Sequence, residues 1–120
     1  MSVERRSSPR AVQPGAIALK DAQTEWAAQM RNLSASGVYC SMAQFIPPLS
    51  KLRVRFELPL GSHKVQVECT GVVVRVEPMA HRGVRAIYQT AIFFTEVSAQ
   101  QRSAIIQFVR QRLATKIAPG

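Results

Sequence analysis

A strict two-residue alternation between residues 51 and 58 constrains the fold more than any other feature. Leu52, Val54, Phe56 and Leu58 fall on one side of this segment, and the residues between them are charged. An extended strand points successive side chains to opposite faces, so the pattern predicts a strand with one buried face and one solvent face.

The next segment repeats this alternation but slips by one residue at Gly71. Three apolar residues share one face before the glycine, namely Val65, Val67 and Cys69. Three others occupy the opposite parity after it, namely Val72, Val74 and Val76. A one-residue slip at a glycine indicates a β-bulge, which bends a strand as closure of a barrel requires.

Strand-like patterns also occur at residues 16–20, 24–31, 38–42 and 84–95. The period then changes, because apolar residues recur at helical spacing at Ile105, Ile106, Val109 and Leu113. Ser98 and Gln101 have the spacing of a capping box, so we expect a helix from about residue 99 to about 115. Six short strands followed by one helix predict a mainly β fold, a six-stranded antiparallel barrel with a C-terminal α-helix, spanning residues 16–117 as one domain.

Residues 1–15 precede this predicted domain and show neither strand nor helix periodicity. They contain Pro9, Pro14 and Gly15, so we expect an irregular and flexible tail. No apolar stretch follows the first arginines, so the chain carries no recognisable signal peptide and is predicted to be cytoplasmic, with Cys40 and Cys69 reduced. No apolar run approaches the length of a membrane span.

The charge and the scattered reactive residues limit the classes of function. The formal net charge is +9, which favours anionic partners such as nucleotides, phosphates or nucleic acid. His63 and His81 lie in predicted turns without metal-ligand spacing, and the two cysteines lie on predicted apolar faces. We therefore expect no enzyme activity, no metal and no cofactor. Trp26 and the pair Phe93–Phe94 are expected in the core.

Two short motifs carry the functional signal. Residues 6–10 read R-x-x-x-R, and residues 32–37 read N-x-S-x-x-G. The pair, in this order and separated by two short strands, resembles the PilZ domain family, whose signature is R-x-x-x-R followed by [D/N]-x-S-x-x-G. The six-stranded pattern with its C-terminal helix is similar to that family over essentially the whole chain.

The resemblance implies a receptor for cyclic di-GMP, a bacterial second messenger. Its implied ligand residues are Arg6, Arg10, Asn32, Ser34 and Gly37, and we expect the N-terminal arginines to fold back onto the turn at residues 32–37. A guanidinium matches phosphate oxygens and the guanine O6/N7 edge, and the Asn32 amide can accept from guanine N–H groups. Many members have Asp at the position of Asn32, so a neutral amide here implies weaker binding.

One more arginine bears on stoichiometry. Arg5 directly precedes the motif, and in the family an arginine at that place is associated with a stacked, intercalated ligand dimer. The resemblance therefore implies two cyclic di-GMP molecules per domain. Arg75, on an outward face, is a weaker candidate for the site.

The expected function is a non-catalytic receptor or adaptor that changes conformation on binding and regulates an unidentified protein in trans. In the family, outputs include motility, exopolysaccharide production, biofilm formation and virulence. Two alternatives remain open: a PilZ-like interaction protein that does not bind the nucleotide, and a small basic barrel that binds nucleic acid. The second is disfavoured, because no basic strand rich in aromatic residues is present.

Overall fold

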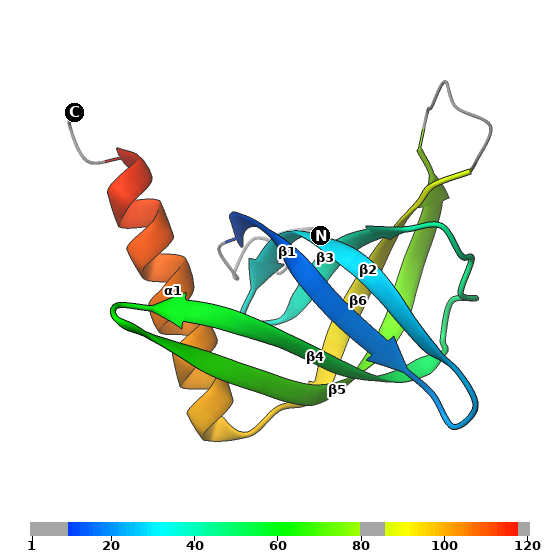
Figure 1. Cartoon of the computed structure of the whole chain (residues 1–120), viewed down its shortest axis with the longest axis horizontal. Helices are drawn as coiled ribbons and strands as arrows, with labels where there is room; N and C mark the ends of the chain where they lie inside the picture. The colour runs from blue at the N-terminus through cyan, green and yellow to red at the C-terminus, as the bar shows by residue number, and fades with distance from the viewer. Residues whose placement is uncertain (1–9, 80–85, 118–120) are drawn as a thin grey trace, which may run out of the picture.

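A computed structural model describes residues 10–79 and 86–117, with only the backbone described at 12–14 and 115–117. The strands are β1 (Arg10–Lys20), β2 (Glu25–Ser34), β3 (Gly37–Met42), β4 (Lys51–Leu60), β5 (His63–Pro78) and β6 (Tyr88–Glu96), followed by the helix α1 (Ala99–Ile117). The strands form a closed antiparallel barrel in the order β1-β2-β3-β6-β5-β4 (Figure 1). The predicted six-stranded barrel with a C-terminal helix is confirmed.

β4 alternates between buried and exposed residues along its whole length, as the sequence pattern predicted. Leu52, Val54, Phe56 and Leu58 are all buried in the core, and the charged residues between them are exposed. β4 pairs with β5 on one side and with β1 on the other. The second of these seams, which closes the barrel, consists of four residue pairs that join residues 17–20 to residues 53–56.

The β5–β6 ladder has a register shift at the predicted place, between Thr70 and Gly71, but the extra residue there is Thr95 of β6. The slip within β5 itself comes later, at a second register shift between Val73 and Arg75. The buried face of β5 continues without a slip through Gly71 to Val73, and the extra residue is Val74, which is 52% exposed. A glycine has no side chain to reveal which face it occupies, so the pattern could not place the slip. Gly71 is instead required by close packing, because a Cβ there would lie 2.6 Å from Cγ2 of Ile92.

The first strand is longer than the sequence predicted. β1 begins at Arg10, so residues 10–15, expected in an irregular tail, belong to the barrel. One extra residue in β1 between Val12 and Gly15 shifts its register against β2. This bulge next to Pro14 breaks the two-residue period and conceals the strand. Residues 1–9 lie outside the described part.

The helix begins as predicted and is anchored by a residue that the predicted stripe omitted. The Gln101 backbone N–H donates to Ser98 Oγ at 3.1 Å, whereas the Gln101 side chain accepts from the backbone N–H of Glu68 on β5 instead of completing a capping box. Phe108 is 1% exposed and packs with Ile105 and Val109 against the barrel. None of the helical residues described here forms a stretch both long and apolar enough to cross a membrane.

Both cysteines are free thiols in the core, and burial raises the pKa of Cys40 to about 12 and that of Cys69 to about 11. Above pH 9, the ordinary value, an unfolded thiol ionises while a buried one stays protonated. The folded state then holds more protons than the unfolded state, so stability falls as pH rises from about 9 towards the folded pKa. We expect each thiol to contribute a loss of about 1.4 kcal/mol per pH unit in this window.

Urea unfolding under reducing conditions at several pH values from 8 to 10.5 tests this expectation. Cys40→Ala should flatten the pH dependence relative to the wild-type protein. Identical slopes for the two proteins would show that the Cys40 thiol already titrates normally in the fold.

Candidate functional site

The two sequence motifs meet where β1 starts and β2 ends. Arg10 is in register with Ser34 across the β1–β2 ladder, and its Nη1 donates to Oδ1 of Asn32 at 2.7 Å. The contact joins residues separated by 22 positions in the chain. The strand pairing therefore places the second arginine of R-x-x-x-R directly on the first residue of N-x-S-x-x-G.

Tyr39 is a member of this cluster that the motif analysis missed. It lies opposite Asn32 in the β2–β3 ladder, and the Arg10 guanidinium carbon sits 4.7 Å from the centre of its ring. Partial burial lowers the pKa of Arg10, while Tyr39 opposes that shift. The Tyr39 ring thus holds the Arg10 guanidinium in position through its face, and this contact leaves N–H donors of Arg10 free to bind other groups. The motifs gave no sign of this contact, because Tyr39 lies on β3 and Arg10 on β1, the two strands on either side of β2.

Ser34 acts within the turn and not at its surface. The residue is completely buried, and its hydroxyl oxygen accepts from the backbone N–H of Ser36 at 3.2 Å. The same hydroxyl lies 3.4 Å from the Gly37 carbonyl oxygen, to which it donates. The turn is also tied to β6, because the Phe94 N–H donates to the Ser36 carbonyl at 2.9 Å. Ser34 therefore fixes the shape of the turn.

Gly37 is explained by the barrel itself. Its φ is not in the left-handed region, where Gly61, with a φ of 60°, is the only glycine among the residues described. A Cβ on Gly37 would stand 2.3 Å from the carbonyl oxygen of Ile92 on β6. The missing side chain thus permits β3 and β6 to approach closely at Gly37, a residue that the resemblance also places among the ligand residues.

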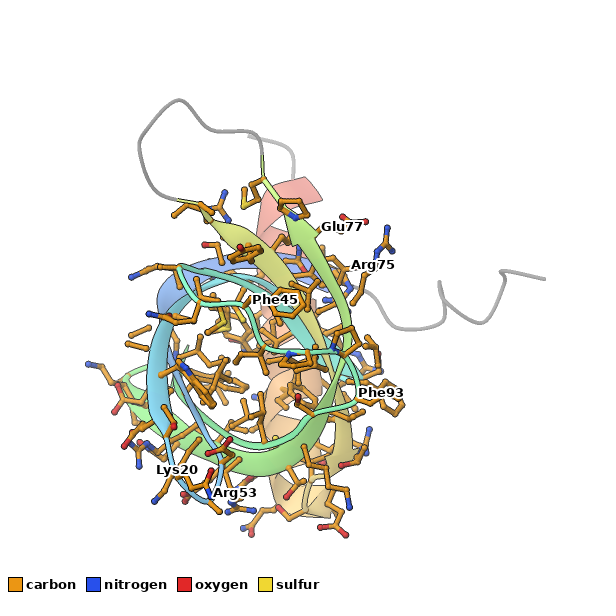
Figure 2. The ribbon with its side chains drawn as sticks, turned by 90° about the vertical axis from the view of Figure 1, so that its right-hand side faces the viewer. Lys20, Phe45, Arg53, Arg75, Glu77 and Phe93 are labelled. Carbon is orange, nitrogen blue, oxygen red and sulfur yellow. The ribbon has the colours of Figure 1, made fainter. Side chains whose placement is uncertain are left out.

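The site continues across the outer faces of four neighbouring strands. Asn32 on β2, Tyr39 on β3, Ala91 on β6 and Arg75 on β5 are successive partners in the ladders. Phe93, expected in the core, points outward and is 49% exposed beside Gly37, whereas Phe94 is buried. Figure 2 shows Phe93 and Arg75 projecting from the same side of the barrel.

Arg75 is already paired within its own strand. Its Nη2 lies 2.9 Å from Oε2 of Glu77, and its Nε donates to the same oxygen at 3.0 Å. Both side chains are more than half exposed, so the ion pair is weak, and another anion can replace the Glu77 carboxylate on Arg75. Among the described residues, Arg75 has no hydrogen bond or ion pair with Arg10 or Asn32, and it therefore lies at the border of this outer face.

The outer face thus presents the guanidinium of Arg10, the amide of Asn32 and the aromatic rings of Tyr39 and Phe93. Such a set suits a planar, anionic ligand that lies flat on the barrel. Arg5 and Arg6 lie outside the described residues, as does His81. Within the ranges 10–79 and 86–117, no three His, Cys, Asp or Glu side chains gather as they would to bind a metal.

Comparison with solved structures gives the same fold. The Bacillus subtilis inhibitor of motility MotI/DgrA is 22% identical with a TM-score of 0.81, and the match covers 94% of this chain and 53% of that one. The PilZ domain of YcgR from Escherichia coli, solved with c-di-GMP, is 12% identical with a TM-score of 0.68, covering 93% and 94%. The K. pneumonia MrkH–c-di-GMP complex is 12% identical with a TM-score of 0.67, covering 93% and 54%.

The chain therefore spans about half the length of MotI/DgrA and of MrkH. No curated protein sequence is similar enough to be counted as a relative. The family model of the PilZ domain, in contrast, matches residues 4–111, a range that includes both motifs, all six strands and most of α1. The chain belongs to the PilZ domain family.

Proposed function

We propose that this protein is a non-catalytic receptor for cyclic di-GMP. The observation that carries the proposal is the 2.7 Å hydrogen bond from Arg10 to Asn32, which unites the two halves of the family signature at one place. Two of the similar structures, the YcgR domain and MrkH, contain c-di-GMP according to their descriptions. Family membership and this local geometry support the same ligand.

Among the described residues, some contact the ligand directly and others hold the site in shape. Arg10 uses one of its N–H groups on Asn32 and retains others for a phosphate or for the O6/N7 edge of guanine. Phe93 presents an exposed aromatic face on which a guanine can stack, and the Tyr39 ring holds the Arg10 guanidinium in position. Ser34 and Gly37 serve the site indirectly by fixing the turn and its contact with β6.

The remaining arginines determine how many ligands bind. Arg6 completes the R-x-x-x-R motif, and Arg5 precedes it, in the position that the family associates with an intercalated ligand dimer. Two stacked ligands carry four phosphates, which suits several guanidinium groups better than one. We therefore propose two cyclic di-GMP molecules per domain, with Arg5 and Arg6 closing over the ligand that lies on Arg10.

Ligand binding then produces a signal that another protein reads. Closure of the arginine segment onto the outer face of the barrel replaces an open cationic surface with one that includes the ligand. A partner that recognises this new surface is regulated in trans. Motility is an output consistent with the description of MotI/DgrA as an inhibitor of motility; exopolysaccharide, biofilm and virulence outputs are further family possibilities.

Calorimetric titration with cyclic di-GMP tests the proposal. The Arg6→Ala/Arg10→Ala variant should bind at least about 100-fold more weakly than the wild-type protein, because it loses two charge-assisted contacts. The matched control is Arg55→Ala/Arg110→Ala, which removes the same charge from exposed positions away from the turn and should bind normally.

The outcomes separate the competing functions. Equal losses in both double variants would show that only the overall charge matters, as for a nucleic-acid-binding barrel. Absence of binding by the wild-type protein would favour an interaction module that does not bind the nucleotide. A stoichiometry of one ligand per domain would exclude the intercalated dimer while leaving the receptor function intact.

A further inference from the structure

A second concentration of positive charge lies at the opposite end of β1. Lys20, Lys51 and Arg53 surround a hollow of about 330 Å3, which we call the basic hollow; Asp21, Ala22, Leu52 and Thr70 also line it. Lys20 and Arg53 face each other directly in the β1–β4 register. Like charges directly opposite on a sheet destabilise it, so this pair is not explained by the needs of the fold.

The cations of the basic hollow are poorly neutralised within the chain. Oδ1 of Asp21 is occupied by the backbone N–H groups of Gln23 and Thr24, each at 2.8 Å, so it serves the β1–β2 turn. Among the described residues, the Lys20 and Lys51 ammonium groups have no hydrogen bond or ion pair. Arg53 donates to the Thr70 hydroxyl at 3.1 Å, and its Nη2 is 3.9 Å from a Glu68 carboxylate oxygen.

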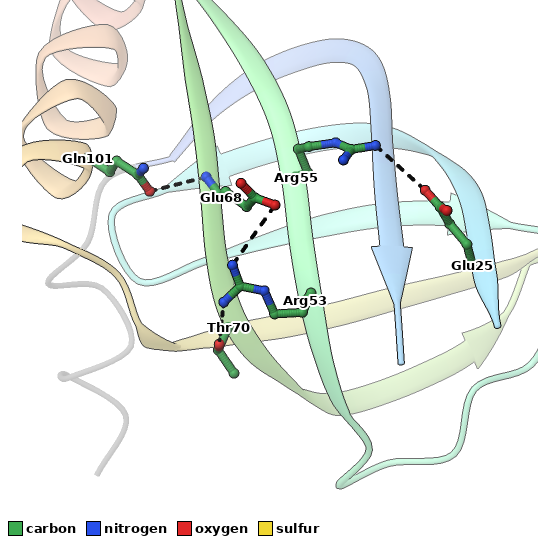
Figure 3. Close-up of polar contacts among 6 residues, drawn as sticks. All are labelled: Glu25, Arg53, Arg55, Glu68, Thr70 and Gln101. Carbon is green, nitrogen blue, oxygen red and sulfur yellow. Dashed lines mark hydrogen bonds and ion pairs between the residues drawn. The ribbon is translucent and has the colours of Figure 1, made fainter. Parts of the chain in front are cut away.

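On the adjoining surface, the arginines of β4 are paired with carboxylates of this chain. A smaller hollow of about 100 Å3 shares Lys20 and Arg53 with the first and is also lined by Glu25 and Glu68. There, Arg55 pairs with Glu25 at 3.6 Å, and Figure 3 shows the two arginine–glutamate pairs side by side across β4. All four side chains are about half exposed, so a carboxylate from outside can compete for the same guanidinium groups.

The distribution of positive and negative side chains over the two hollows also limits the kind of partner that can bind. Glu25 and Glu68 line the smaller hollow and not the basic hollow, so a long polyanion such as a nucleic-acid backbone would pass over carboxylates, whereas a short anionic segment would not. A hollow of this size accommodates one or two side chains, and its excess of positive charge lies on Lys20 and Lys51. A short acidic protein segment has the matching charge and dimensions.

We propose that the basic hollow docks an acidic segment of a partner protein, whose carboxylates bind between Lys20, Lys51 and Arg53. Figure 2 shows Lys20 and Arg53 along the bottom of the barrel wall, away from Phe93 and Arg75, which lie on its right on the face proposed to bind the nucleotide. β1 carries Arg10 at its first residue and Lys20 at its last. The partner surface and the ligand surface are thus separate and can be occupied together.

Titration of the 15N-labelled protein with a hexaglutamate peptide tests the proposal. The peptide should shift the amide resonances around residues 20–22, 51–53 and 70 in a saturable manner. Lys20→Gln/Lys51→Gln should bind the peptide about fivefold more weakly than the wild-type protein. Lys64→Gln/Arg110→Gln removes the same charge from exposed residues that do not line the hollow and should bind as the wild-type protein does.

Equal weakening in both variants, or shifts spread over the whole basic surface, would overturn the proposal. An oligothymidylate of equal charge that bound this hollow more tightly than the peptide would also overturn it and assign the surface to nucleic acid. Cyclic di-GMP titration of Lys20→Gln/Lys51→Gln should match the wild-type result, which keeps failure at this surface distinct from failure of the nucleotide site.

Discussion

Gly37→Ala is expected to lower the free energy of unfolding by about 3 kcal/mol or more. The added methyl group would stand 2.3 Å from the Ile92 carbonyl oxygen and 3.3 Å from its carbonyl carbon. These are backbone atoms of β6, so no rotation of a flexible side chain can relieve the contact. The β3–β6 ladder would have to separate at the pair formed by Gly37 and Phe93.

Urea unfolding monitored by circular dichroism measures this loss. Gly61→Ala is the matched control, because a Cβ there meets no atom within 4 Å and only its φ of 60° opposes the substitution. We expect the control to cost about 1 kcal/mol. A Gly37→Ala protein with wild-type stability and reduced affinity for cyclic di-GMP would show instead that this glycine is needed for the ligand.

Phe108→Ala is expected to cost about 4 kcal/mol, the range found when a large buried aromatic side chain is removed. Phe108 is the largest of the fully buried side chains and lies on the face of α1 that packs on the barrel. Its ring also carries the Arg112 guanidinium, whose carbon is 4.9 Å from the ring centre. Truncation therefore leaves a cavity and removes a cation–π contact together.

The same unfolding measurement, with Gln107→Ala as the control, tests this expectation. Gln107 is the preceding residue on the helix and is exposed, so its truncation should change stability by less than about 0.5 kcal/mol. A loss below about 1 kcal/mol for Phe108→Ala would mean that the Phe108 side chain contributes little to holding α1 on the barrel. Retention of the helical signal in that variant would identify the remaining apolar residues as sufficient anchors.

The strand pattern was predictable wherever a side chain reports which face it occupies. Leu52 to Leu58 were assigned correctly because every position on the inner face is large and apolar and every outer one is charged. The pattern failed at Gly71 and at residues 10–15, where a glycine, a proline or a bulge interrupts the alternation. Phe93 was misplaced for another reason, because an exposed aromatic residue on a β-strand looks like a core residue in the sequence.

The candidate site was predictable in its members but less so in their separate roles. The resemblance to the PilZ family put Arg10 and Asn32 in one site, and the strand register brings them into contact. Spacing could not reveal that Ser34 is turned inward or that Gly37 faces Ile92, because both depend on how β3 meets β6. Tyr39 was missed because its contribution arises from a contact with a residue 29 positions earlier in the chain.

The four residue pairs that join β1 to β4 have a kinetic consequence. β1 is the first strand to be synthesised, yet it can complete the cylinder only after residues 53–56 have emerged and folded beside it. Such a long-range closure forms late and is the first place where a barrel can reopen. The hydrogen bond from Arg10 to Asn32 joins β1 to β2 at the other end of the strand, so a ligand held there leaves the β1–β4 seam free to open on its own.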